Sequence, residues 1–202
     1  MCPISDKDIN EITERVLKSL ASETSLSKPA NPVQVNPNKN EPSTSSTEGK
    51  LKVAIGTDHG GFTLKEILKP YLIELGYEVI DCGTNSKEAV DYPDFALAVA
   101  SMVSQGKVWR GIMIDGAGIG SCMVANKVPG IRAAACHDYS SALNSREHND
   151  ANLLTLGAGL IGENLAKQIV KTWLTTDFLG GRHTKRVDKI IAIEKQFLKG
   201  NQ

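Results

Sequence analysis

The sequence lacks three features that would point away from a water-soluble intracellular protein: long apolar runs, cysteine pairs and an excess of charge. No apolar stretch approaches the ~20 residues needed to span a bilayer. Basic and acidic residues number 23 each, so charge gives no reason to expect nucleic acid or a membrane as partner. The four cysteines form no CxxC pair and have no metal-ligand spacing with the four histidines. We therefore expect a cytoplasmic protein with free thiols and no metal.

The overall composition is that of an ordinary globular protein, but apolar and polar residues are distributed unevenly along the chain. Hydrophobic residues make up 41% and charged residues 23% of the 202 positions, which is enough for one well-buried domain. The pattern predicts three parts: an amphipathic helix in residues 1–20, a linker in 21–50 and a folded domain in 51–202.

The first part carries apolar residues at three- and four-residue steps, which form one face of a short helix. They are Ile9, Ile12, Val16, Leu17 and Leu20. This part is neither a secretory signal nor a transit peptide, because it lacks a continuous apolar core and carries more acids than bases. The second part is rich in proline, serine and asparagine. It has too few apolar groups to offset the entropy of ordering, so we expect a disordered linker.

From residue 51 onward, short apolar strands alternate with helical patterns. We expect strands at 51–56, 78–81, 111–114, 131–136 and 152–157, a helix over 62–75 ended by Gly76, and a last helix over about 184–198. This repeat predicts an α/β fold, namely a three-layer, doubly wound, Rossmann-like sheet of five parallel strands. Ligands of such sheets bind at the carboxyl ends of the strands.

Polar and glycine-rich segments follow several of the expected strands. They are residues 57–61, 115–120, 137–138, 146–150 and, near the C-terminus, 180–186. Glycines in a loop let the backbone approach a ligand, and N–H groups at a helix start can hold an anion or an oxyanion. Arg182 and Arg186 are four apart and could grip a phosphate from one helix face.

Each segment also has a plainer interpretation. The glycine loop could be only a tight turn, Asp58 a helix cap beside a solvent-facing His59, and the two arginines a solvated face. Dinucleotide binding is disfavoured, although Asp138 lies 18 positions beyond Gly120. The spacing is GxGxG rather than GxGxxG, and the loop follows the third strand instead of the first.

Taken together, blocks in this order resemble the ribose-5-phosphate isomerase B family and its galactose-6-phosphate isomerase relatives over about residues 51–195. The blocks are DHGGFTLK (58–65), DYPDFA (91–96), GAGIG followed by ANKVPGIRAA (116–134), CHD (136–138), REHNDANLLTLGA (146–158) and GGRHTKRVDKI (180–190). The resemblance implies a five-stranded doubly wound sheet and cofactor-free aldose–ketose isomerisation of a sugar phosphate. It also implies a homodimer or dimer of dimers, in which the partner subunit completes each active site.

The resemblance further implies roles for individual residues. Isomerisation needs ring opening, a base that moves a proton between adjacent carbons, and donors for the enediolate oxygen. By resemblance, Asp58 and His148 open the ring, Asn149 holds a hydroxyl and Tyr92 lines the pocket. The loop at Gly116, Gly118, Ile119 and Gly120 stabilises the enediolate, and the phosphate ligands are His59, Arg182 and Arg186.

Several positions depart from the family pattern. A tyrosine usual one place later stands at Tyr139, with Ser140 in its place. Asp115 stands where many members have a cysteine base, and Ala117 where they have a threonine. Ser121 stands where other members have a glutamate base, and Gly159 replaces an arginine. We expect Asp115 to be the replacement base, so that Asp115→Asn abolishes turnover and spares ligand binding. The alternative is that Asp115 is only a turn residue in a protein that has lost isomerase activity. The changes also suggest a substrate other than plain ribose 5-phosphate.

An amphipathic helix on a flexible tether resembles the encapsulation peptides of bacterial microcompartment cargo. This implies that residues 4–20 contact a shell protein or another cargo protein and that the chain is located inside a microcompartment. A disordered or oligomer-contacting extension is the alternative. For the domain, three classes stay open: an isomerase, a non-catalytic sugar-phosphate binder or scaffold, and a nucleotide-dependent oxidoreductase. The presence of Asp58, His148 and Asn149 favours the isomerase.

Overall fold

A computed structural model describes residues 49–197, which form one α/β sheet domain. The helix expected in residues 1–20 and nearly all of the linker expected in 21–50 lie outside the described residues. The elements are β1 (Lys52–Thr57), α2 (Phe62–Glu74), β2 (Glu78–Asp81), α3 (Tyr92–Ser104), β3 (Arg110–Asp115), α4 (Ile119–Ala125), β4 (Ala133–Ala135), α5 (Tyr139–Glu147), β5 (Leu153–Gly157), α6 (Glu163–Thr175), a 3-10 turn η1 (Gly181–His183) and α7 (Thr184–Phe197).

The five strands pair in the order β2-β1-β3-β5-β4, and every pair is parallel. This confirms the predicted doubly wound sheet. The strand limits differ from the expected ones by no more than two residues, which is the usual uncertainty of element ends. Gly76 ends α2 with a φ of 94°, as its position predicted. The chain reverses its winding between β1 and β3, so the topological switch lies there.

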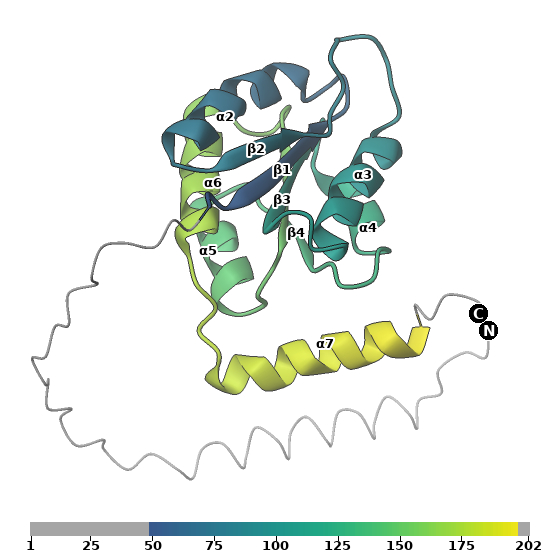
Figure 1. The fold of residues 1–202 in the computed structure, drawn as a ribbon, viewed down its shortest axis with the longest axis vertical. Coiled ribbons are helices and arrows are strands. Elements are labelled where there is room, and N and C mark those ends of the chain that lie inside the picture. Colours follow the sequence, from purple (N-terminus) through teal and green to yellow (C-terminus); the bar gives the residue numbers. More distant parts are fainter. Residues whose placement is uncertain (1–48, 198–202) are drawn as a thin grey trace, which may run out of the picture. The chain divides into compact units, whose positions relative to one another are not determined.

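Helices cover both faces of the sheet, as Figure 1 shows. α2, α5 and α6 pack their apolar side chains on one face, and α3 and α4 cover the other. The two resulting cores contain fully buried residues from every layer, such as Leu68, Ile114 and Trp173 on the first face and Val99 and Met113 on the second. Both faces are apolar because parallel sheets of this kind are buried on each side.

Helix α3 approaches the sheet closely because two strand residues lack side chains. A Cβ atom added at Gly56 would lie 2.5 Å from Val99 Cγ2, and one added at Gly111 would lie 2.7 Å from Val99 Cγ1. No real Cβ contact is this short, so only glycine fits at either position. The close packing fixes the start of α3, and with it Tyr92, beside the carboxyl ends of β1 and β3.

Strand β4 is an edge strand, and the Asn126 side chain covers part of its open edge. Asn126 Oδ1 accepts a hydrogen bond from the Ala133 N–H at 2.9 Å, and Asn126 Nδ2 donates to the Ala133 carbonyl at 3.0 Å. The amide therefore imitates a neighbouring strand at this residue. Unpaired edge groups invite pairing with another chain, and a side-chain cover removes that opportunity.

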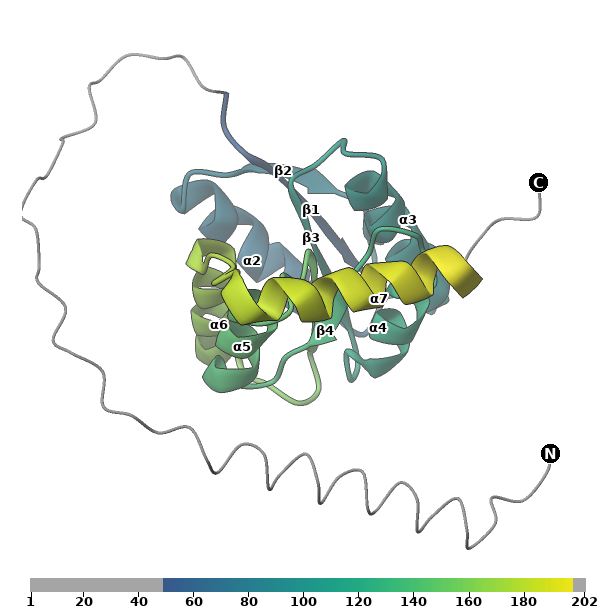
Figure 2. The same cartoon turned by 90° about the horizontal axis from the view of Figure 1, so that it is seen from below.

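Helix α7 lies apart from the two helical layers and runs across one end of the sheet, as Figure 2 shows. Its main polar tie to the domain is the bond from the Gly130 N–H to Glu194 Oε2 at 2.8 Å. One face of α7 is left largely exposed although it is apolar, with Ile190 44%, Ile193 58% and Phe197 71% accessible. None of the helices formed by residues 49–197 is long and apolar enough to cross a membrane.

Candidate active site

The carboxyl edge of the sheet holds Asp58 directly after β1. Its Oδ1 accepts hydrogen bonds from the N–H groups of Gly60 (3.0 Å) and Gly61 (3.2 Å), and the residue is only 7% exposed. The loop turns so tightly that a Cβ at Gly60 would lie 3.3 Å from Asp58 Oδ1 and 3.6 Å from the Gly116 nitrogen. Asp58 is thus fixed beside the glycine loop, and its Oδ2 has no partner in the described chain.

His59 and Tyr92 lie at the same edge. His59 is exposed, and its Nδ1 is 3.2 Å from both the backbone nitrogen and the carbonyl oxygen of Val90. The Tyr92 ring covers Gly120 so closely that an added Cβ would lie 2.6–2.7 Å from three of its ring and hydroxyl atoms. The loop after β1, the start of α3 and the glycine loop therefore meet at one place, as the sequence predicted for these residues.

Asp115 ends β3, and its carboxylate faces its own loop. Oδ1 accepts hydrogen bonds from the N–H groups of Ala117 (2.8 Å) and Gly118, and Oδ2 accepts from the Ser121 N–H (3.1 Å) and the Ser121 hydroxyl. The residue is 5% exposed. Four donors from three residues surround a carboxylate that sequence reasoning expected to act on substrate. In this arrangement Asp115 organises the loop.

The way Asp115 is bonded determines which loop amides remain free. The prediction that the Gly118 N–H stabilises the enediolate is wrong, because this N–H donates to Asp115. Gly118 instead provides the left-handed backbone conformation, with a φ of 75°, from which α4 begins. The N–H groups of Gly116, Ile119 and Gly120 make no hydrogen bond within the described chain. Three donors thus stay open at this edge, and the Gly116 nitrogen lies near Asp58, since a Cβ added at Gly60 would lie 3.6 Å from it and 3.8 Å from Asp58 Oδ2.

The carbonyl groups of the loop are held from behind by β5 and β4. Thr155 Oγ1 donates to the Gly118 carbonyl at 2.6 Å, and His137 Nε2 lies 2.8 Å from the Ala117 carbonyl. The Gly159 N–H donates to the Gly116 carbonyl at 3.0 Å. With its carbonyls fixed from one side, the loop presents its free N–H groups to the other. His137 was named in the sequence only as part of a motif, and sequence reasoning gave it no role.

His148 and Asn149 lie at the opposite, amino edge of the sheet. The helix α5 that starts at the carboxyl end of β4 carries them back past the sheet, and Asn152, just after them, bonds to Gly111 at the start of β3 through its carbonyl at 3.1 Å. Strand β3 has six residues and is about 20 Å long. Asp58 and His148 of one chain therefore cannot contact the same small molecule.

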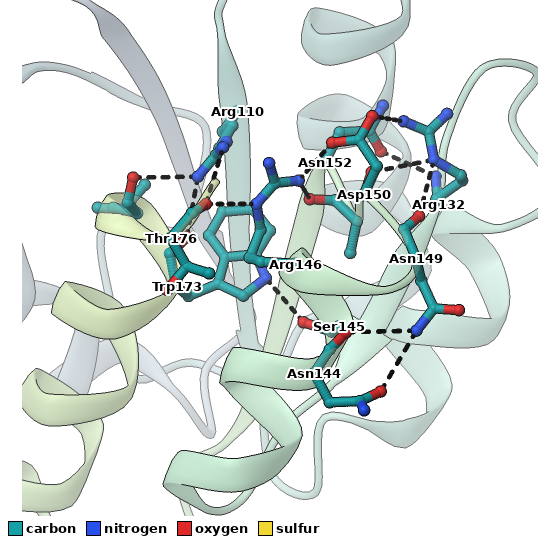
Figure 3. Close-up of polar contacts among 12 residues, drawn as sticks. Arg110, Arg132, Asn144, Ser145, Arg146, Asn149, Asp150, Asn152, Trp173 and Thr176 are labelled. Atoms are coloured by element: carbon teal, nitrogen blue, oxygen red, sulfur yellow. Dashed lines mark hydrogen bonds and ion pairs between the residues drawn. The ribbon is translucent and has the colours of Figure 1, made fainter. Parts of the chain in front are cut away.

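The turn that carries Asn149 is clamped by two arginines on Asp150, as Figure 3 shows. Asp150 has a φ of 46°, which is unusual for a residue with a side chain. Its carboxylate binds Arg132 Nη2 at 2.9 Å and Arg146 Nη1 at 2.8 Å. Arg132 Nε also donates to the carbonyls of Asn149 (3.2 Å) and Asp150 (2.9 Å). These contacts hold a strained turn in one conformation.

A second pair of contacts joins this turn to the end of α6. Arg146 Nε donates to the Thr176 carbonyl at 3.2 Å, and Arg110 Nη1 donates to the Trp173 carbonyl at 2.8 Å (Figure 3). Both guanidinium groups also lie near the Trp173 ring, at 5.3 and 5.8 Å from its centroid. Burial, together with the nearby Arg146 charge, lowers the pKa of Arg110 to about 10. The network keeps the amino edge rigid.

Arg182 and Arg186 reach the amino edge as well, through a histidine stack. His183 is buried and its ring is parallel to that of His148, with centroids 4.1 Å apart. Burial, followed by the charges of His148 and the arginines, lowers the pKa of His183 from 6.5, so the stack favours an uncharged ring. Arg182 and Arg186 are exposed. His148, Asn149 and these arginines form one cationic group, which we call the amino-edge group.

The predicted site residues thus form two separate groups. The first, at the carboxyl edge, contains Asp58, His59, Tyr92, Asp115 and the glycine loop, and the second is the amino-edge group. The sequence predicts His148 and Asn149 at the end of a helix after the fourth strand, and the end of α5 at Glu147 confirms this. Their grouping with the segments at the carboxyl ends of strands is corrected, because they lie just before β5, at the amino edge. Within residues 49–197, no cluster of three or more metal-ligating side chains is present.

Substitution of Asp115 separates its two possible roles. In Asp115→Asn the amide nitrogen cannot accept hydrogen bonds from the loop, so we expect the glycine loop to lose its shape. Turnover and ligand binding would then both fall, and the free energy of unfolding would drop by about 1–3 kcal/mol. Urea denaturation and calorimetric titration with a sugar phosphate measure these effects. Unchanged binding with abolished turnover would instead support a direct role as base.

Comparison with known proteins agrees with this architecture. A family model described as Ribose/Galactose Isomerase matches residues 53–190. Ribose-5-phosphate isomerase B of Escherichia coli is 49% identical over 145 residues, which are 72% of this chain and 97% of that protein. D-erythrulose-4-phosphate isomerase of Pectobacterium atrosepticum is 44% identical over 147 residues, which are 72% and 97% of the two chains.

A solved structure is also similar to this chain, in both sequence and fold. Ribose-5-phosphate isomerase B of Clostridium thermocellum has 54% sequence identity and a TM-score of 0.72, over 73% of this chain and 99% of that one. The match includes the parallel sheet and every segment that carries a candidate site residue. The chain therefore belongs to the ribose/galactose isomerase family.

Proposed function

We propose that the protein is a cofactor-independent aldose–ketose isomerase of a sugar phosphate. The observation that carries the proposal is the set of three open N–H groups on Gly116, Ile119 and Gly120 at the edge of the sheet that also holds Asp58, whose Oδ2 is free and lies near the Gly116 nitrogen. Donors held in place stabilise an enediolate because they need no reorganisation when the charge develops. The carboxylate Oδ2 of Asp58 is placed to accept a sugar hydroxyl proton as the ring opens.

The amino-edge group contains a second proton-transfer group and two arginines, which the carboxyl edge of the same chain lacks. Sugar opening needs a second proton-transfer group, and the phosphate needs cations. His148, Asn149, Arg182 and Arg186 are of these kinds but lie a sheet length away in their own chain. We therefore propose a homodimer, alone or within a dimer of dimers, in which this group of one copy meets Asp58 and His59 of the other. The exposed apolar face of α7 supports the same arrangement.

We propose a small phosphorylated sugar as the substrate of this chain. The relatives act on different members of this class. One relative acts on ribose 5-phosphate and another on D-erythrulose 4-phosphate, by their names. Gly159 and Ala117 carry no polar side chain at positions where the family pattern has an arginine and a threonine. These changes support a related aldose phosphate as substrate in place of plain ribose 5-phosphate.

A panel of tetrose, pentose and hexose phosphates in deuterated buffer tests the proposed activity. We expect at least one to incorporate deuterium at C2 and to form the corresponding ketose without added cofactor, followed by NMR. Deuterium enters because the abstracted proton can exchange with solvent before it is returned. Saturable binding of a sugar phosphate without exchange of any would favour a non-catalytic binder or scaffold of the same fold.

Mixing two inactive variants tests the shared site. Asp58→Asn and His148→Gln each remove one proton-transfer group, and we expect each homodimer to be inactive. Coexpression would produce heterodimers in which one site carries both substitutions and the other carries neither, so activity would return. A mixture that stays inactive, although mass spectrometry shows heterodimers, would contradict the sharing. Coexpression of two copies of the same variant is the matched control.

The N-terminal 20 residues form the second part of the proposal, which is supported by their sequence pattern alone. An amphipathic helix on a 30-residue Pro/Ser-rich tether suits a cargo protein of a bacterial microcompartment, with residues 4–20 on a shell or another cargo protein. We expect deletion of residues 1–20 to leave isomerisation unchanged and to abolish co-purification with shells. Loss of turnover on deletion would show instead that the segment completes the active site.

A further inference from the structure

We infer that Lys65 positions His59 for the substrate phosphate by anchoring the loop of residues 82–91, and this inference rests on the proposed function. Lys65 belongs to α2, and its side chain has no exposed surface. Burial of an ammonium group costs free energy unless each of its three protons has an acceptor. The proposed function gives Lys65 no contact with the sugar, so its role lies in what the ammonium group holds.

The Lys65 ammonium group joins the end of β2 to the loop that follows it. Nζ donates to both carboxylate oxygens of Asp81, at 2.9 and 2.7 Å, and to the Thr84 carbonyl oxygen at 2.9 Å. Burial raises the pKa of Asp81, but the hydrogen bonds from Lys65 and Lys69 lower it below its usual value of 3.8. The carboxylate is therefore charged near neutral pH and keeps the ammonium group in place.

The first part of the loop packs against the end of β1. The Thr84 N–H donates to the Thr57 carbonyl at 3.0 Å. A Cβ atom added at Gly83 would lie 2.6 Å from the Thr57 nitrogen and 3.0 Å from Lys65 Cδ, so only glycine fits there. Residues 83 and 84 thus contact both the Lys65 side chain and the strand end, two residues before His59.

The last part of the loop holds His59. The Nδ1 atom of this ring lies 3.2 Å from both the nitrogen and the carbonyl oxygen of Val90. Two further N–H groups of the loop donate to hydroxyl oxygens of the loop itself. Among the hydrogen bonds of residues 49–197, those of Val90 with His59 are the only ones that join residues 85–90 to a residue outside the loop. Lys65 therefore anchors the loop at its start, and the loop holds His59 at its end.

The contact with Val90 leaves Nε2 of His59 as a hydrogen-bond donor. In the uncharged ring Nδ1 can accept from the Val90 N–H, which puts the proton on Nε2. In the charged ring Nδ1 donates to the Val90 carbonyl, and Nε2 keeps its proton. Within residues 49–197, Nε2 has no hydrogen-bond partner. Because phosphate oxygens accept hydrogen bonds, both forms of His59 can donate to the phosphate while the loop holds Val90 beside the ring.

Lys65→Met removes the ammonium group and keeps a side chain of similar length. The Thr84 carbonyl then loses its donor and the loop its anchor, so His59 is held less firmly against the phosphate. For the sugar phosphate that the wild type turns over best, we expect KM to rise about tenfold, as for one charge-assisted hydrogen bond, while kcat changes less. Initial rates followed by NMR give both constants.

Lys65→Met combined with Asp81→Asn covers the case of a folding defect. Lys65→Met alone leaves a partly buried carboxylate with one counter-charge fewer, whereas the two substitutions together remove both charges. The new amide oxygen can still accept from the Gly83 N–H, as the carboxylate does at 2.9 Å. We expect the same rise in KM, with thermal unfolding showing that the domain is folded.

Lys69→Met is the matched control. Lys69 Nζ lies 2.8 Å from Asp81 and 3.2 Å from Glu66, and Lys65 Nζ lies 2.7 and 3.2 Å from the same carboxylates. Of the two lysines, only Lys65 donates to the Thr84 carbonyl. We therefore expect Lys69→Met to leave KM and kcat near their wild-type values. A rise in KM equal to that of Lys65→Met would assign the effect to the charge at Asp81 and overturn the inference.

Combination of Lys65→Met with His59→Ala separates positioning from a general structural effect. If Lys65 acts through His59, its substitution raises KM little further once the ring is gone, so the two effects are not additive in free energy. A full additional rise, or an unchanged KM in Lys65→Met, would overturn the inference. The proposed function fails differently, because the wild type would then exchange no sugar phosphate of the panel. If the wild type binds one without exchange, dissociation constants from calorimetry replace KM in the same comparison.

Discussion

The parallel pairing of all five strands gives the sheet two chemically different edges, and the distribution of every polar group follows from this. All strands end at one edge, so the loops after β1, β3 and β4 meet there with their carboxylates, glycines and His137. The helices return the chain to the other edge, where the amino-edge group collects. A sheet about 20 Å across separates the two groups. Chemistry that needs both requires two copies of the chain.

Most of the fold was predictable because each helix and strand has its own local pattern of apolar residues. The alternation of short apolar runs with helical periods predicted the strands, and Gly76 predicted the end of α2. Strand order was not predictable from periodicity. The placement of β5 inside β4 depends on which helices share a face, and no residue alone encodes that.

The site was predictable by residue type but not by geometry. His148 follows the nine-residue helix α5, which advances about 13 Å back along the sheet, and the turn after it reaches the amino edge, where β5 begins. The Asp138 cap could have signalled this, since it fixes where α5 begins: its side chain accepts a hydrogen bond from the Ser141 N–H. For Asp115 the sequence offered two interpretations, a base and a turn residue, and could not decide between them. Its role depends on a side-chain rotation toward Ser121 that becomes visible only once the loop is folded.

The Asn126 amide that covers Ala133 has a consequence for crowding. An open strand edge lets identical chains join sheet to sheet, and this route to insoluble assemblies grows with concentration. A single neutral side chain blocks this route without adding charge that would repel neighbouring copies. The Asn126 side chain thus keeps β4 from serving as a template for a second sheet at Ala133.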